Sequence, residues 1–110
     1  MSRPVFFEPE ASHELEAAAL WYETQRSGLG LTFLAAVDET VDHLTTWPDA
    51  GTLVPGVPAH LKVRQAPVLR FPYRVAYLAT SRELRVLAVA HTRRRPGYWR
   101  SRTEPPSASQ

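Results

Sequence analysis

Cysteine is absent from this sequence of 110 residues, which excludes disulfide bonds and a thiolate nucleophile. No apolar run approaches the roughly 20 residues that a membrane-spanning helix requires. The first fourteen residues include carboxylates where a secretory signal needs an unbroken apolar core. We therefore expect a soluble, cytoplasmic protein with no membrane partner.

Basic residues are scarce in the first half of the chain, and carboxylates are scarce in the second. Residues 1–60 hold two arginines against nine carboxylates, whereas residues 61–110 hold eleven basic side chains against two carboxylates. The net charge of +2 therefore conceals formal charges of −7 and +9. Lys62 is the only lysine, so the positive half is almost entirely guanidinium, which favours directed contacts. This polarity predicts an anionic partner for one face of the molecule.

Two amphipathic helices are predicted in the first half, after a short β-prone run at residues 5–8. Apolar residues recur at helical spacing over about residues 11–26, and a second such stripe covers about residues 31–47. Gly28 is expected to cap the first helix, and Gly30 to make the joint to the second one tight. The two helices should therefore pack as an antiparallel hairpin.

Three strands are predicted in the second half, at residues 62–69, 73–78 and 84–91. Pro67 places the first of them near an edge, and the last is apolar on both faces and therefore central. The short turns between them demand antiparallel pairing. We predict one α/β (α+β) domain over residues 1–102 with the order β-α-α-β-β-β. It has an antiparallel sheet, a helical hairpin packed on one face and a short C-terminal helical turn. Residues 103–110 should form a disordered tail.

A cationic loop follows the last strand. Arg93, Arg94 and Arg95 lie between His91 and Tyr98. Guanidinium groups match phosphate geometry and stay charged at physiological pH. The loop therefore predicts a site for RNA, DNA or another polyanion, and the alternative is a solvated turn without a ligand. The remaining histidines, at positions 13, 43 and 60, have no paired ligand spacing, so we expect neither a metal nor a cofactor.

The order and spacing of residues along nearly the whole chain resemble the RelE/ParE superfamily of toxins from bacterial type II toxin–antitoxin systems, also called plasmid-stabilisation proteins. The matching residues are Ala11, Glu14-Leu15, Trp21-Tyr22-Glu23, Gly28-Leu29-Gly30, Phe33, Pro48, Gly51, Arg64, Phe71-Pro72-Tyr73-Arg74-Val75, Tyr77, Val86 to His91, Arg93-Arg94, Pro96, Tyr98-Trp99 and Arg102. The resemblance implies a small toxin that arrests growth and is held inactive by a cognate antitoxin protein in a toxin–antitoxin hetero-oligomer. Some members cleave messenger RNA in the ribosomal A site, others poison DNA gyrase, and many have no established target.

Resemblance to the RNase members implies catalytic roles near the end of the chain. Tyr98 occupies the place of their C-terminal tyrosine, and Arg93 or Arg94 would stabilise the phosphate. His91 would exchange protons near neutral pH. The side chains that would bind the nucleic acid or another target are Arg64, Arg70, Arg74 and Arg95. The alternative interpretation is structural, with Tyr98 and Trp99 anchoring the C-terminal segment on the sheet and His91 ending a buried strand.

The antitoxin is expected to bind through a helix and an extended segment. Its apolar face would dock on the helical hairpin and a sheet edge. Its acidic residues would meet Arg64, Arg70 or the loop at 93–95, with Trp99, Arg64 and Arg94 as the main contacts.

The scarcity of lysine separates the alternatives for the target. The efficient ribosome-dependent RNases of the family carry several lysines through the strands and the loop, where this chain has only Lys62. The His-x-x-Arg-x-Pro-x-Tyr-Trp pattern at residues 91–99 is more similar to the ParE-like branch, whose target is DNA gyrase or unassigned. Two alternatives stay open: a metal-independent mRNA endonuclease of the RelE-like kind, and an inactive fold that binds only its antitoxin. The protein would be an enzyme only if it is the endonuclease.

Overall fold

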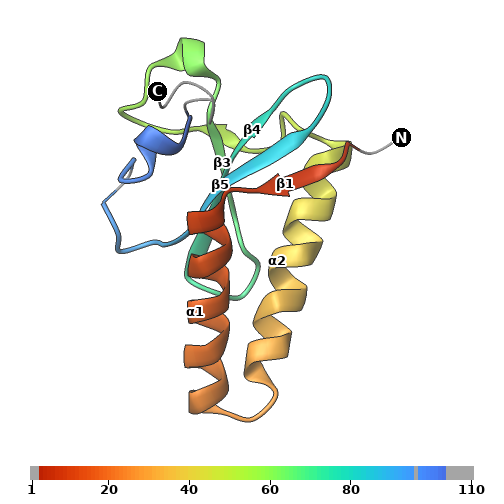
Figure 1. Cartoon of the computed structure of the whole chain (residues 1–110), viewed down its shortest axis with the longest axis vertical. Helices are drawn as coiled ribbons and strands as arrows, with labels where there is room; N and C mark the ends of the chain where they lie inside the picture. Colours follow the sequence, from red (N-terminus) through yellow and green to blue (C-terminus); the bar gives the residue numbers. More distant parts are fainter. Residues whose placement is uncertain (1–2, 96, 104–110) are drawn as a thin grey trace.

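The computed structural model describes residues 3–95 and 97–103 (Figure 1). Within these residues the chain forms two α-helices, five strands and two short 3-10 turns. In chain order they are β1 (Val5–Phe7), α1 (Pro9–Gln25), α2 (Leu29–Thr46), β2 (Thr52–Leu53), η1 (Ala59–Leu61), β3 (Arg64–Pro67), β4 (Tyr73–Ala79), β5 (Leu84–His91) and η2 (Arg100–Thr103). The α+β class, the helical hairpin and the C-terminal helical turn are confirmed. Thr103, expected in the tail, belongs to η2, and residues 104–110 lie outside the described residues.

The strands form one sheet in the order β1-β5-β4-β3-β2. Strands β2 to β5 pair antiparallel, and β5 has a neighbour on both sides, as its apolar sequence predicts. Strand β1 pairs parallel with β5, with Val5 opposite Leu84 and Phe7 opposite Val86. The prediction of a wholly antiparallel sheet is therefore wrong for this strand. Its direction is not fixed by a short turn, because a helical hairpin follows it instead of a second strand.

The helical hairpin depends on a close approach between α1 and α2, which lie side by side in Figure 1. Gly28 has φ +89° and is the N-cap of α2, immediately before Leu29, whereas Arg26 is the C-cap of α1. The glycine expected to cap the end of the first helix therefore caps the start of the second. The Glu23 carboxylate accepts hydrogen bonds from the backbone N–H groups of Gly28 and Gly30, at 3.0 Å in each case. These bonds satisfy N–H groups at the start of α2 that have no partner within the helix.

The core under the hairpin fills one face of the sheet. Ala11, Ala18 and Ala19 of α1 meet Phe33, Val37, Val41 and Leu44 of α2 over the side chains of β4 and β5. Small residues on α1 and larger ones on α2 let the helices lie close to each other and to the sheet.

A second hydrophobic core lies on the opposite face of the sheet from the helical hairpin. Val54, Val63, Leu87 and Trp99 belong to it, so the C-terminal segment and the connection after β2 cover this face. Strand β5 contributes to both cores, because alternate side chains of a strand point to opposite faces. A bulge interrupts the alternation: Ala76 lies opposite Ala88 and Tyr77 opposite Val86, which leaves Leu87 as the extra residue. Leu87 and Ala88 belong to the second core, while Val86 and Val89 belong to the first.

No helix within the described part of the chain combines the length and the apolar character needed to cross a membrane.

We expect Gly30→Ala to destabilise the protein, because a Cβ atom at this position would lie 2.6 Å from the Ala19 carbonyl oxygen. Overpacking of this kind costs about 1–3 kcal/mol, which exceeds the gain of about 1 kcal/mol that alanine has over glycine in a helix. Urea unfolding measures the loss. The matched control is Leu31→Ala, one residue along and 73% exposed, which should change the free energy of unfolding little. Equal stabilities of the two variants would contradict the close approach.

Candidate functional site

The C-terminal segment is held on the sheet by Trp99. Its side chain is 3% exposed and packs in the second core with Leu87 and Ala88 of β5. Burial gives the indole a folding role, so it has no exposed surface to offer directly to a partner. The structural interpretation of this residue is thus the one that the geometry supports. An effect of Trp99 on antitoxin binding would act through the position of the segment that it anchors.

Glu14 of α1 joins three parts of the fold. One carboxylate oxygen, Oε1, accepts hydrogen bonds from the Val89 backbone N–H and from Arg102 Nη1, both at 3.0 Å. The other, Oε2, accepts the Tyr98 hydroxyl at 2.6 Å. The Glu14 and Arg102 side chains are 18% and 15% exposed. A largely desolvated carboxylate therefore ties α1 to β5 and to the C-terminal segment.

Sequence reasoning named Glu14 and Arg102 only as parts of the family resemblance and missed the contact between them. A signal was present in the sequence. Glu14 lies three residues after Ala11 and four before Ala18, both buried, so it shares their helix face. A carboxylate on a buried helix face needs a cation or several donors, and Arg102 and Tyr98 supply them.

Tyr98 is a poor general base in this arrangement. Burial raises the pKa of its phenol, and the hydrogen bond to Glu14 and the nearby negative charge raise it further. The guanidinium groups of Arg94 and Arg102 lower it by a smaller amount. The Arg94 guanidinium carbon lies 3.9 Å from the centre of the Tyr98 ring, in a cation–π contact. The phenol is thus protonated at neutral pH, with its proton directed to Glu14.

His91 is held by the loop that follows it. Its Nδ1 accepts the Arg93 backbone N–H at 3.0 Å, and its carbonyl accepts the Arg94 N–H at 2.9 Å. The neutral ring therefore carries its proton on Nε2. The ring packs edge-on against Tyr73, with the ring centres 5.1 Å apart. The histidine is therefore positioned structurally, and its Nε2–H can act as a hydrogen-bond donor.

A pocket of about 260 Å³ lies between α1 and the ends of β4 and β5. Its lining includes three aromatic residues, one histidine and one guanidinium, and consists of Glu14, Ala17, Ala18, Trp21, Tyr73, Val89, His91, Arg94 and Tyr98. Trp21 is 57% exposed at its rim. The pocket joins three residues expected in the site, His91, Arg94 and Tyr98, to a helix face that was expected only to form core.

The predicted arginines divide among separate places. Arg74, Arg94 and Arg95 line one small hollow that also touches His91 and Tyr98. Arg93 is exposed at the start of the loop. Arg74 of β4 thus lies close to Arg94 and Arg95 of the loop.

Two other predicted arginines lie away from this group. Arg64 Nη1 donates to the Gly51 carbonyl at 2.8 Å, and Arg64 Nε lies 3.7 Å from an Asp49 carboxylate oxygen. Arg64 therefore stabilises the turn after α2. The Tyr77 hydroxyl stabilises the same turn, because it donates a hydrogen bond to the Pro48 carbonyl and accepts one from the Gly51 N–H. Arg70 has φ +74° and lines a different hollow beside α2. Arg64 and Arg70 therefore lie apart from Arg74 and Arg95, the other two arginines predicted to bind a target.

Within the described ranges, no three His, Cys, Asp or Glu side chains lie close enough together to bind a metal ion.

The fold and the site define a small α+β domain with a helical hairpin on a mixed sheet and a cationic, aromatic C-terminal segment. This architecture is similar to that of a solved chain from the chromosomal ParDE toxin–antitoxin system of P. aeruginosa. The two superpose with a TM-score of 0.68 at 20% sequence identity, over 82% of this chain and 96% of that chain. The likeness confirms the expected ParE-like fold. No protein-family model and no curated protein matches the sequence.

We expect Glu14→Gln to lower the pKa of the Tyr98 phenol, because the variant removes the negative charge that helps to raise it. Ultraviolet titration of phenolate measures this change, with Tyr98→Phe identifying the residue and Glu16→Gln as the exposed control on the same helix. The free energy of unfolding should also fall, by about 1–3 kcal/mol, because the donors around Glu14 lose an ionised acceptor. A Tyr98 titration that is the same in Glu14→Gln and in the unmodified protein would contradict this contact.

The same contact gives the protein a pH dependence in alkali. The folded protein holds the Tyr98 proton more tightly than the unfolded chain, whose phenol has the ordinary pKa of 10.0. The resulting stability is fully present below pH 10 and is lost as pH rises from there toward the folded pKa. Tyr98→Phe should show a smaller alkaline loss than the unmodified protein.

Proposed function

We propose that this protein is the toxin of a toxin–antitoxin pair, which arrests bacterial growth and is neutralised by a cognate antitoxin protein. The observation that carries the proposal is the likeness to a chain of a ParDE system over 96% of that chain. The residue pattern that resembles the RelE/ParE superfamily also supports the proposal, because it rests on side chains and not on the course of the backbone. Three residues of that pattern, Glu14, Tyr98 and Arg102, form one hydrogen-bonded group in the structure.

A protein target such as DNA gyrase is favoured over RNA cleavage. An RNase mechanism requires a group that takes the proton of the 2′-hydroxyl, and the Tyr98 proton is directed to Glu14 instead. Arg94 lies against the Tyr98 ring, and two of the expected phosphate-binding arginines, Arg64 and Arg70, lie elsewhere. The exposed cations that do gather, Arg74, Arg94 and Arg95, form a patch that can contact an acidic protein surface.

Exposed apolar side chains support the helical hairpin as the surface that the antitoxin contacts. Leu20, Trp21 and Leu31 are large apolar residues that are mostly exposed, and Trp21 borders the aromatic pocket beside Arg94. An antitoxin helix would cover the apolar residues, and an acidic side chain of the same protein would reach Arg94.

Expression of the protein without an antitoxin should arrest the growth of bacteria, and co-expression of the neighbouring gene product should restore growth. Colony counts after induction measure both effects. Trp99→Ala is the unfolded negative control. Truncation of this core side chain should lower the free energy of unfolding by about 3–5 kcal/mol and abolish growth arrest through loss of the fold. Unimpaired growth with folded protein confirmed in the cell would remove the toxin assignment.

The target is tested by adding purified protein to a translating extract and, separately, to DNA gyrase. We expect messenger RNA to stay whole, supercoiling to fall and cleaved DNA–gyrase complexes to accumulate. Arg94→Ala and Arg95→Ala should weaken the gyrase effect, whereas Arg82→Ala, in the exposed turn before β5, should not. Cuts within codons that disappear in Tyr98→Phe would establish the RNase alternative instead. Absence of both activities would exclude messenger RNA and DNA gyrase as targets.

A further inference from the structure

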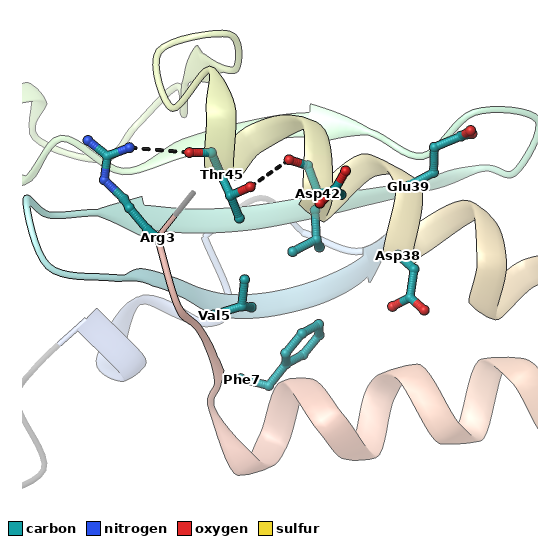
Figure 2. Close-up of a pocket in the computed structure, with 8 residues that line it drawn as sticks. Arg3, Val5, Phe7, Asp38, Glu39, Asp42 and Thr45 are labelled. Carbon is teal, nitrogen blue, oxygen red and sulfur yellow. Dashed lines mark hydrogen bonds between the residues drawn. The ribbon is translucent and has the colours of Figure 1, made fainter. Parts of the chain in front are cut away.

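A further hollow lies away from the cationic segment, between β1 and α2. It measures about 610 Å³. Figure 2 shows its two walls: Val5 and Phe7 extend from β1, while Asp38, Glu39 and Asp42 come from α2. Val41 adds to the apolar floor. We call this hollow the β1–α2 groove.

The strand that forms one wall is an open sheet edge. Strand β1 pairs only with β5. The bonds from Leu84 N–H to the Pro4 carbonyl and from Glu8 N–H to the Val86 carbonyl show that the even-numbered residues face β5. In a parallel pair alternate residues bond to the same neighbour, so the backbone groups of Val5 and Phe7 point outward. Such an edge is a template for an additional strand.

The other wall is acidic. None of the ion pairs within the described ranges uses Asp38, Glu39 or Asp42, although each is exposed. The nearest cation in the lining, Arg3, bonds the Thr80 and Thr45 carbonyls at 2.7 and 3.3 Å. Three carboxylates of α2 therefore border the groove, and the one cation among its lining residues is Arg3, at one end.

We propose that the β1–α2 groove binds an extended basic segment of a partner protein, which pairs with the outer edge of β1. Alternate side chains of an added strand would face α2, about 7 Å apart. Asp38 and Asp42 are one helical turn apart, about 6 Å along α2. Two lysines or arginines at alternate positions therefore match the two carboxylates, and their apolar stems would cover Val5 and Phe7. This inference does not depend on the toxin function.

A second copy of this chain fits the groove poorly. Pairing of β1 with β1 across a two-fold axis would bring two acidic helices to the same interface, and like charges there oppose association. The loop at 93–95 is basic but lies in a turn, so it does not supply the extended segment. Charge and edge geometry together select a strand from a different protein.

The test uses a fluorescent nine-residue peptide of alternating lysine and valine on the whole protein. Two controls have the same length: alternating glutamate and valine, and a peptide with the first composition but its lysines in one block. We expect saturable binding of the alternating basic peptide alone, weaker at high salt, with changes in the amide signals of Val5 and Phe7 on nuclear magnetic resonance.

Variants separate the two walls. Asp38→Asn with Asp42→Asn should weaken binding about tenfold, whereas the matched double variant Glu10→Gln with Glu16→Gln, of equal charge change on α1, should not. Val5→Pro removes an outward N–H without touching the bonds to β5, and should also weaken binding about tenfold. Thermal unfolding confirms that each variant is folded.

Four results would overturn the proposal. They are no binding at about 1 mM peptide, equal binding of the acidic or block peptide, signal changes at residues 93–95 instead of β1, and an unchanged affinity in Asp38→Asn with Asp42→Asn. Peptide-free protection of the β1 amides that grows with protein concentration would show a second copy in the groove, which also contradicts it. Growth arrest is a separate readout, so neither result decides the other.

Discussion

The Glu14 carboxylate is the contact on which the rest of the site depends. It accepts hydrogen bonds from the Val89 backbone N–H of β5, the Tyr98 hydroxyl and the Arg102 guanidinium. These three donors lie 75, 84 and 88 residues after Glu14 in the chain. A buried carboxylate is stable only with its charge compensated and its oxygens bonded. The C-terminal segment meets both needs, so the orientation of Tyr98, and through it of Arg94, follows from the position of α1.

Ion pairs convert the charge polarity of the sequence into contacts between its two halves. Glu8 pairs with Arg85, Glu14 with Arg102 and Asp49 with Arg64, and each pair joins an acid of the first half to an arginine of the second. Asp38, Glu39 and Asp42 of α2 and Arg74, Arg94 and Arg95 at the C-terminal end of the sheet take no part in these pairs. Acidic side chains therefore remain on α2 and cationic ones around Arg94, which the two proposals above assign to different partners.

Strand β5 contributes to both faces of the sheet, because successive side chains of a strand point to opposite faces. The bulge at Leu87 shifts this alternation, so that Val86 and Val89 face the helical hairpin while the consecutive residues Leu87 and Ala88 both face the C-terminal segment. Burial of Trp99 on the second face fixes the loop that carries the arginines. The cationic segment thus has a rigid base, as a binding residue on a loop requires.

The sequence by itself determined the two helices, the antiparallel strands, the apolar character of β5 and the uneven distribution of charge. These features follow from local periodicity and turn chemistry, which act over a few residues. Only the tertiary structure decided that β1 runs parallel to β5, that Glu14 faces Tyr98, that Arg64 fastens a turn and that Trp99 is core. Each of these depends on groups far apart in the chain, whose meeting is set by the packing of α1 and the C-terminal segment on the sheet rather than by any local pattern.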